Sequence, residues 1–305
     1  MKILWLSPTS MNIEFVIGSL EYIREPHWEI EIVRYDAYGE DKTNEIMIQK
    51  TLEYSPDIIL YISTAGGPYL PTIKTFKTLR DITTIAQICC DASCPGWHPL
   101  IKQYKENECF DLIANLDGCE NWPHDDKDLT LISPVDPRPY LNASVNYDSF
   151  SSRPIHCGFC GGDGSQYRRD ILYHLLMNSA LRVKPREEKI GTYQKYADFM
   201  MRCKIVINMS LSGSGLSRQV KGRVVETALA GACLLEDNGS ATSKWFIPGE
   251  DYIEYEGKHN ALEIINSLYD NDITMFRCAE NLRRKVMTEH SPKVIWNKVF
   301  SQLHL

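Results

Sequence analysis

Residues 203–237 read CKIVINMSLSGSGLSRQVKGRVVETALAGACLLED, and the fold class can be inferred from them. The run 203–210 is apolar at five of its eight positions and is predicted to be a strand. A loop of small residues follows, then a helical segment at 223–232 and a second apolar strand at 233–237. A strand, a helix and a parallel strand make a right-handed crossover, so the sequence predicts an α/β fold with doubly wound parallel sheets.

The same alternation continues on both sides of this stretch. In the second half, 155–162 reads as a strand that runs into a glycine-rich loop, and helices are predicted at 167–179 and 193–202. The tail from Asn260 is predicted to be mostly helical. In the first half the predicted strands and helices alternate over 2–6, 12–24, 28–35, 43–54, 57–63, 70–81, 83–89, 98–107 and 110–116.

A chain of 305 residues is long enough for two domains. The segment 129–140 reads as a short strand followed by three prolines, and we interpret it as the exit from the first domain. The polar segment 141–153 is predicted to be a linker. We therefore expect a first domain over 1–140 and a second domain over 151–290.

Composition limits the class of protein. Hydrophobic residues make up 43% and charged residues 24%, as in ordinary soluble globular proteins, and the net charge of −7 gives no general attraction to nucleic acid. The N-terminus has too short an apolar run for a signal peptide, and no run is long enough to span a membrane, so we expect a cytoplasmic protein. Of the ten cysteines, Cys157 and Cys160 form one C-x-x-C pair without a second pair, which favours buried reduced thiols over a zinc site.

Two loops of the second half have features of anion-binding sites. Gly161 and Gly162 join a strand to a helix, where glycines allow a close approach and the helix N-terminus attracts anions. Arg168 and Arg169 follow in the first turns of that helix and could neutralise a diphosphate. The alternative is a plain turn with solvated arginines.

The second loop contains Ser212 and is followed by Arg218, Lys221 and Arg223. These basic side chains suit phosphates, and the carboxylate of Glu226 on the next helix suits two ribose hydroxyls. The alternative is a surface glutamate that pairs with Arg223 three residues before it.

The stretch KGRVVETALAGACLLEDNGSATSKWFIPGEDYIEYEG (221–257) resembles the C-terminal domain of group-1 GT-B glycosyltransferases, closest to the spore-maturation, CgeB-like branch. FCGGDGSQYRRDIL (159–172) is similar to the segment that opens the second domain of such enzymes, and ISPVDPRPY (132–140) is similar to their inter-domain crossing. The first half resembles the family in layout more than in sequence.

The resemblance implies two Rossmann-like domains that face each other across a cleft, with the nucleotide sugar mainly on the second. Glu226 would hold the ribose, and Arg168 or Arg169 would lie near the diphosphate together with Arg223. The chain has Arg218 where the family has the first glutamate of a Glu-x7-Glu pair, which contacts the donor sugar; Arg218 could bind phosphate instead. In such enzymes the last helix, here 291–305, commonly packs back on the first domain.

The first domain is expected to supply the acceptor site and any base. Asp91 and Asp117 each follow a predicted strand, His98 is close to Asp91 in the sequence, and a group at a strand end is well placed to accept a proton. The alternative for each is a turn-forming or helix-capping residue.

Two charged segments are interpreted as solvated surface. Residues 124–128 contain an Asp-x-Asp pattern that could hold a divalent cation, but they lie in a charged stretch away from the predicted nucleotide loops. No metal is therefore expected, and arginines and helix dipoles would take the charge of the leaving group. The other segment is the basic face of the tail, formed by Arg277, Arg283, Arg284 and Lys285.

The resulting hypothesis is a metal-independent glycosyltransferase without a cofactor. It would move a sugar from a nucleoside-diphosphate sugar such as a UDP-sugar to a hydroxyl of a saccharide, a small molecule, a protein or modified DNA. The resemblance favours retention of the anomeric configuration. The alternatives are a phage-type enzyme acting on hydroxymethylated DNA bases, a GT-B-like sugar-nucleotide epimerase and a non-catalytic sugar-nucleotide sensor, the last suggested by Arg218.

Overall fold

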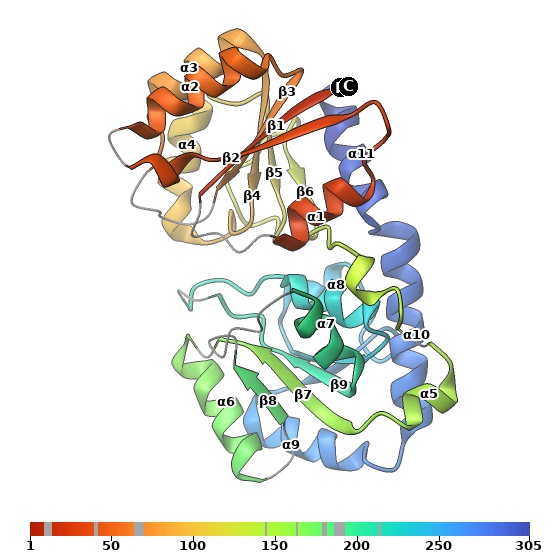
Figure 1. Ribbon diagram of the computed structural model, residues 1–305. Helices are drawn as coiled ribbons and strands as arrows, with labels where there is room; N and C mark the ends of the chain where they lie inside the picture. Colours follow the sequence, from red (N-terminus) through yellow and green to blue (C-terminus); the bar gives the residue numbers. More distant parts are fainter. Residues whose placement is uncertain are drawn as a thin grey trace. The chain divides into compact units, whose positions relative to one another are not determined.

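The computed structural model describes residues 1–8, 14–39, 42–63, 70–143, 145–162, 164–178, 182–185, 193–212 and 215–305. The chain forms two compact units (Figure 1). Unit 1 comprises Met1–Ser133 and Ile295–Leu305, and unit 2 comprises Pro134–Val294. Each unit is an α/β structure built on one parallel sheet, as the alternating pattern predicts.

The sheet of unit 1 has six parallel strands in the order β2-β1-β3-β4-β5-β6. The all-apolar stretch of β3 is central, and its residues 58–62 are completely buried because helices cover both faces of the sheet. The strands are β1 (Lys2–Ser7), β2 (Glu29–Arg34), β3 (Ile58–Ser63), β4 (Thr84–Cys89), β5 (Leu112–Asn115) and β6 (Leu129–Thr130).

Helices α2 (Thr43–Tyr54), α3 (Ile73–Ile82) and α4 (His98–Glu106) lie on one face of this sheet, and α1 (Glu14–Tyr22) lies on the other (Figure 1). The last helix, α11 (Pro292–Gln302), packs beside α1. The indole Nε1 of Trp296 donates to Ser19 Oγ at 2.9 Å, and its ring meets that of Trp5 edge-on at 6.2 Å.

The sheet of unit 2 has five parallel strands in the order β8-β7-β9-β10-β11. The order along the chain reverses between β7 and β9, and this switch point is where a doubly wound sheet opens a crevice for ligands. The strands are β7 (Ile155–Gly161), β8 (Arg182–Pro185), β9 (Cys203–Asn208), β10 (Cys233–Asp237) and β11 (Ile253–Tyr255).

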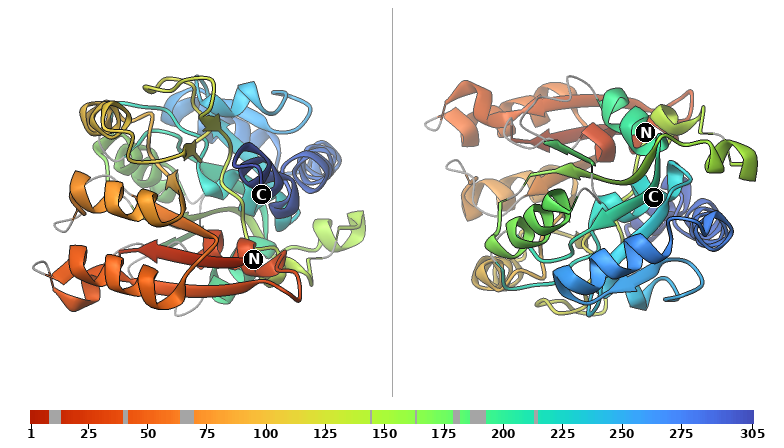
Figure 2. Two further views of the ribbon diagram at one scale, coloured as in Figure 1. Left: turned by 90° about the horizontal axis from the view of Figure 1, so that it is seen from above. Right: turned by 90° about the horizontal axis from the view of Figure 1, so that it is seen from below.

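Six helices belong wholly to the described part of unit 2. Helices α6 and α9 lie side by side on one face of the sheet (Figure 2). The helices are α5 (Tyr147–Ser151), α6 (Gln166–Met177), α7 (Tyr193–Met201), α8 (Gly222–Leu229), α9 (Gly257–Ser267) and α10 (Asp272–Glu289).

The predicted linker is the main error in the organisation of the chain. Within 141–153 the structure places the short helix α5, whose Phe150 is completely buried and packs on Phe276 of α10. Arg153 is also buried and donates to the main-chain oxygens of Cys203 and Ala230. The contacts of Phe150 and Arg153 with residues far away in the sequence therefore make this polar segment part of unit 2, and local composition does not indicate such contacts.

The sequence also does not predict the short strands β8 and β11.

The two segments interpreted as solvated surface are partly buried. Asp128 has a fully buried side chain that accepts from the main chain of Ile113 at 3.1 Å and from Lys105. On α10, Arg283 donates to the main-chain oxygen of Leu229, and Lys285 pairs with the buried Asp251. These charges tie elements together, so the solvated interpretation is wrong for them.

The cysteines, in contrast, are mostly buried, as the sequence predicts. Nine of the ten are buried, Cys157 and Cys160 among them, and burial raises the pKa of the Cys157 thiol well above its usual value. Within the described ranges no three His, Cys, Asp or Glu side chains are placed to hold a metal ion. In the same ranges no helix is long and apolar enough to cross a membrane.

Gly158 on β7 provides a test of the packing of unit 2. A Cβ atom at this position would lie 2.4 Å from Cys203 Sγ and 3.2 Å from the ring of Phe199. We expect Gly158→Ala to destabilise the unit by about 1–3 kcal/mol, because overpacking forces the buried neighbours to move. Thermal unfolding measures the loss, with Gly164→Ala as the matched control, since its Cβ would meet nothing within 4 Å. Equal melting temperatures for the two variants would contradict the packing.

Candidate nucleotide site

The candidate site lies at the carboxyl ends of β7 and β9, at the switch point of the unit 2 sheet. Strand β7 ends at Gly161, Gly162 follows, and Ser165 caps α6 by accepting from the main-chain N–H of Arg168 at 3.3 Å. The N-terminus of a twelve-residue helix is thereby placed directly beyond the strand. This arrangement offers main-chain donors and a positive dipole end to an anion.

Arg223, on the first turn of α8, bridges the two strands at this point. Its Nε donates to the main-chain oxygen of Cys160 at 3.0 Å, and its Nη1 donates to Asn208 Oδ1 at 2.6 Å. The guanidinium lies over the ring of Phe159 at 4.6 Å. Both hydrogen bonds and the ring contact orient the planar group, so two of its three nitrogens are engaged by the protein.

The third nitrogen of the Arg223 guanidinium, Nη2, faces Gly161, which together with Gly162 forms the glycine loop. A Cβ atom on Gly161 would lie 2.3 Å from Arg223 Nη2, so only glycine allows the strand end and the guanidinium to come this close. Within the described residues, Nη2 has no hydrogen-bond partner. A half-buried cation with a donor group left over at a helix N-terminus is suited to bind an anion.

The two arginines of α6 are placed differently from each other. Arg168 is half-buried, and its Nη1 donates to the main-chain oxygen of Gly162 at 2.8 Å, so it braces the glycine loop. Arg169 is exposed and donates to Gln166 one turn earlier. The structure therefore brings Arg168 together with Gly162 but places Arg169 on the outer face of the helix.

Arg218 is held by a carboxylate of the protein itself. Its Nη1 lies 2.6 Å from Oδ2 of Asp237, a completely buried residue at the end of β10, and its guanidinium stacks over Tyr167 at 5.5 Å. Oδ2 of Asp237 also accepts from the hydroxyl of Tyr167, and Oδ1 accepts from the main chain of Ser210. Because these groups share the carboxylate, the cluster braces the loop that follows β9.

That loop contains two more predicted site residues. Ser212 is buried, and its Oγ accepts from the main-chain N–H of Ser217 at 3.3 Å, which closes the turn. Lys221 precedes α8 and donates to the side chain of Gln219. The neighbouring residues 213 and 214 lie outside the described part of the chain.

Glu226 is buried within unit 2, with only 6% of its surface exposed. Its Oε1 accepts from the hydroxyl of Tyr193 at 3.1 Å, and its Oε2 accepts from that of Tyr196 at 2.7 Å. Burial, and then the nearby Glu226 carboxylate, raises the pKa of both tyrosines well above the usual value. The hydroxyls therefore remain donors, and the idea of a surface glutamate is wrong.

Three residues of this site were not singled out from the sequence: Asn208, Tyr193 and Tyr196. Asn208 ends the strand that opens the nucleotide loop, so a polar residue directly after the apolar run 205–207 is the signal that indicates it. The tyrosines occupy positions i and i+3 of α7, which is the spacing of one helix face. Nothing in the sequence indicates that this face meets Glu226.

The three acceptor-side candidates lie in unit 1. Asp117 is buried and accepts from four donors: Oδ1 from Asn115 Nδ2 and Cys119 N–H, Oδ2 from the N–H and hydroxyl of Ser93. It therefore ties the loop after β4 to the loop after β5. Asp91 is half-buried in the first of these loops, where its main-chain oxygen accepts from Cys94. His98 begins α4, and its Nε2 is buried without a hydrogen-bond partner among the described residues.

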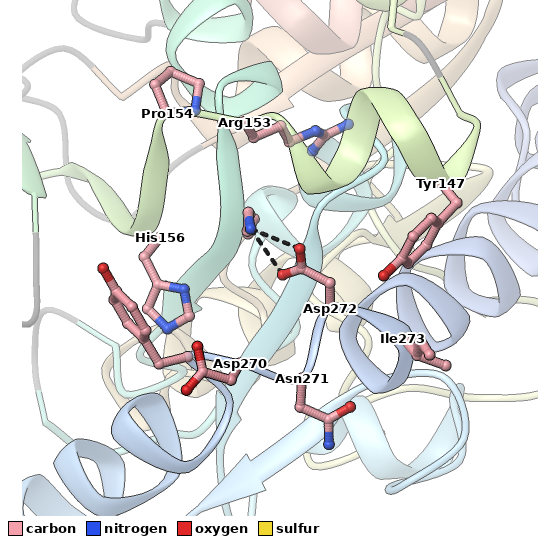
Figure 3. A pocket seen from close by; sticks show the side chains of 10 residues that line it. Tyr147, Arg153, Pro154, His156, Asp270, Asn271, Asp272 and Ile273 are labelled. Atoms are coloured by element: carbon pink, nitrogen blue, oxygen red, sulfur yellow. Dashed lines mark hydrogen bonds and ion pairs between the residues drawn. The ribbon is translucent and has the colours of Figure 1, made fainter.

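A cavity of about 510 Å³ lies at the opposite, amino-terminal edge of the unit 2 sheet (Figure 3). Arg153, His156 and Lys204 line it from the strand starts, and burial lowers the pKa of Arg153 to about 10. Both carboxylate oxygens of Asp272 lie 2.8 Å from Lys204 Nζ. This ion pair joins β9 to α10, and the cavity is separate from the candidate nucleotide site.

Residues 157–301, a little under half of the chain, match the family described as "Glycosyl transferase-like". This match contains the glycine loop, Arg223 and Glu226. No curated protein sequence matches the chain.

Several solved structures are similar over nearly the whole chain. Anabaena Alr3699/HepE, in complex with UDP and glucose, is 12% identical with a TM-score of 0.69, over 100% of this chain and 99% of that one. Sucrose-phosphate synthase from Thermosynechococcus elongatus is 9% identical with a TM-score of 0.65, over 100% and 99%. AviGT4, a glycosyltransferase involved in avilamycin A biosynthesis, is 12% identical with a TM-score of 0.60, over 99% and 96%.

At these identities the likeness shows the fold and not the activity. The CgeB-like branch is not among the matches described above. The chain thus has the GT-B fold, and the part of it that contains the candidate nucleotide site matches the glycosyl transferase-like family.

Proposed function

We propose that the protein is a glycosyltransferase that uses a nucleoside-diphosphate sugar, with a UDP-sugar as the first choice of donor. The observation that carries the proposal is Arg223, whose Nη2 has no partner among the described residues and lies against Gly161 at the switch point. The match of residues 157–301 to the glycosyl transferase-like family supports it. Alr3699/HepE, which has the same fold, binds UDP and UDP-glucose.

In this proposal the diphosphate lies between Arg223 and the N-terminus of α6. The bond between the anomeric carbon and the diphosphate oxygen breaks as the acceptor oxygen bonds to that carbon on the face that the diphosphate leaves, and negative charge builds on the leaving diphosphate. A guanidinium and a helix N-terminus already in place stabilise that charge, which is why we propose catalysis without a metal ion and without a cofactor. Arg168 supports the loop by holding the main-chain oxygen of Gly162.

We place the ribose at Glu226. Its two carboxylate oxygens accept the hydroxyls of Tyr193 and Tyr196, and the resemblance assigns the ribose hydroxyls to the same carboxylate. For the acceptor hydroxyl we propose Asp91 as the base, because it is half-buried in the loop after β4. Asp117 already has four donors and is better suited to position that loop. The stereochemical outcome we propose is retention.

The stabilisation of the folded protein by bound nucleotides tests which nucleotide the donor contains. At about one hundred times the Kd, a nucleotide that binds only the folded state adds about 2.7 kcal/mol, a rise in Tm of roughly 5–10 °C. The measurement is thermal unfolding with UDP, GDP, ADP and dTDP, followed by release of sugar from the matching nucleotide sugars. We expect UDP to give the largest rise. No rise with any of the four would sink the proposal.

A non-catalytic sugar-nucleotide sensor is the second candidate, and the observation that favours it is the Arg218–Asp237 ion pair. It puts a cation, already engaged by a carboxylate, at the position that the resemblance assigns to a sugar-contacting glutamate. The two candidates differ in chemistry, because a transferase hydrolyses its donor slowly when no acceptor is present. Nucleotide binding without any donor turnover, with or without a panel of acceptors, would favour the sensor.

A further inference from the structure

Glu236 has no part in the proposed function, although it lies close to the candidate site. It is the fourth residue of β10 and is completely buried. Its Oε2 accepts from Asn208 Nδ2 on the neighbouring strand β9 at 2.8 Å. A buried carboxyl group is unfavourable unless it has a function or a compensating contact, so this position requires an explanation.

The contact with Asn208 sets the orientation of an amide. Asn208 Nδ2 faces Glu236, and Oδ1 therefore faces Arg223, whose Nη1 donates to it at 2.6 Å. A guanidinium has only donors, so a flipped amide would direct its NH2 group against the guanidinium and lose the hydrogen bond to Arg223. Glu236 supplies the acceptor that holds the amide in the productive orientation.

The ionisation of Glu236 determines what this contact does to the charge of Arg223. Burial, reinforced by the neighbouring Asp237, raises the pKa of the Glu236 carboxyl well above its usual range, which favours the neutral form. A carboxylate paired directly with Arg223 would cancel its positive charge. A neutral acid that acts through an amide fixes the position of the guanidinium and leaves its charge available to an anion.

We propose that Glu236 is a positioning residue for diphosphate binding: through Asn208 it holds Arg223 against Gly161 with Nη2 directed to the phosphates. This inference rests on the proposed function, because it assigns the diphosphate to Arg223. The relay consists of Glu236, Asn208 and Arg223, which belong to β10, β9 and α8.

The test compares UDP with uridine, which lacks the phosphates. Glu236→Leu removes the acceptor, and we expect it to weaken UDP binding about tenfold, the effect of one misplaced charged hydrogen bond, without changing uridine binding. Glu236→Gln keeps an acceptor for Asn208 and resembles the neutral acid, so it should bind UDP within about twofold of the wild type. The matched control is Glu254→Leu, because Glu254 is the register partner of Glu236 on β11.

A second variant covers the case in which Glu236→Leu does not fold. Asn208→Asp puts a carboxylate beside Arg223, which keeps the guanidinium in place but cancels its charge, so UDP binding should fall about tenfold with uridine binding unchanged. In an Arg223→Ala background, the effects of Glu236→Leu and Asn208→Asp should disappear.

The outcomes separate this inference from the proposed function. Wild-type UDP affinity in Glu236→Leu and Asn208→Asp, or an equal loss of UDP and uridine binding, would overturn the positioning role only. A wild-type protein that binds none of UDP, GDP, ADP and dTDP would overturn the proposed function and the positioning role together.

Discussion

Arg223→Ala is expected to weaken UDP binding about 10- to 100-fold, which is the largest effect we predict for affinity. A hydrogen bond from a charged donor contributes about 1.5–3 kcal/mol, and the variant removes a guanidinium that bridges β7 and β9. It also leaves the main-chain oxygen of Cys160 without this donor. Isothermal titration with UDP measures the change.

Two further variants make this result specific. Arg284→Ala is the matched control, since it removes an exposed arginine of the same unit and should leave the Kd unchanged. Arg223→Lys keeps the charge but cannot contact Cys160 and Asn208 as a planar fork, so we expect an intermediate affinity. If Arg223→Ala bound UDP within about twofold of the wild type, the diphosphate would have to lie elsewhere.

Glu226→Ala is the second large effect, and it should reduce both binding and stability. The substitution removes an acceptor from the hydroxyls of Tyr193 and Tyr196, which are half-buried, and the loss of such an acceptor costs about 1–3 kcal/mol. We expect a lower melting temperature and a loss of UDP affinity of about tenfold or more, because the ribose hydroxyls lose their acceptor as well. Thermal unfolding and titration with UDP measure the two effects.

The nucleotide and its fragments separate the two roles of Glu226. Ribose 5-phosphate should compete with UDP in the wild type and fail to compete in Glu226→Gln, which fills the same volume but carries one oxygen instead of two. The stability of Glu226→Gln should fall less than that of Glu226→Ala, since an acceptor remains for one tyrosine. A variant that unfolds more easily but binds UDP normally would show that Glu226 is structural only.

The alternation of apolar strands and helical segments was sufficient to predict two doubly wound units. Strand β3 illustrates the reason. Its residues 58–62 are buried on both faces of the sheet and form an apolar run, and such a run can be recognised from the local sequence alone. The short helix α5 illustrates the limit. Phe150 and Arg153 are ordinary residues of a polar segment until they meet Phe276 and the main chain of Cys203, and those partners are far away in the sequence.

Residue type and spacing also predict a site at the glycine loop, Arg223 and Glu226, and its role in nucleotide binding stays a prediction. The different roles of the basic side chains around this site could not be predicted from the sequence. Arg168 and Arg169 are adjacent in sequence, yet one braces Gly162 and the other faces solvent, because neighbours on a helix point about 100° apart. Arg218 is a phosphate candidate by residue type, whereas its pairing with Asp237 depends on the side-by-side position of β10 and β9.

The sequence by itself therefore determined the α/β class and the loops that carry glycine and basic residues, because strand burial and turn chemistry are local properties. Only the tertiary structure decided that the charge of Arg218 is compensated by Asp237, and that Nη2 of Arg223 has no hydrogen-bond partner among the described residues. Compensation depends on which strand ends lie next to each other: Asn208 reaches Arg223 on one side and Glu236 on the other only because β9 lies between β7 and β10.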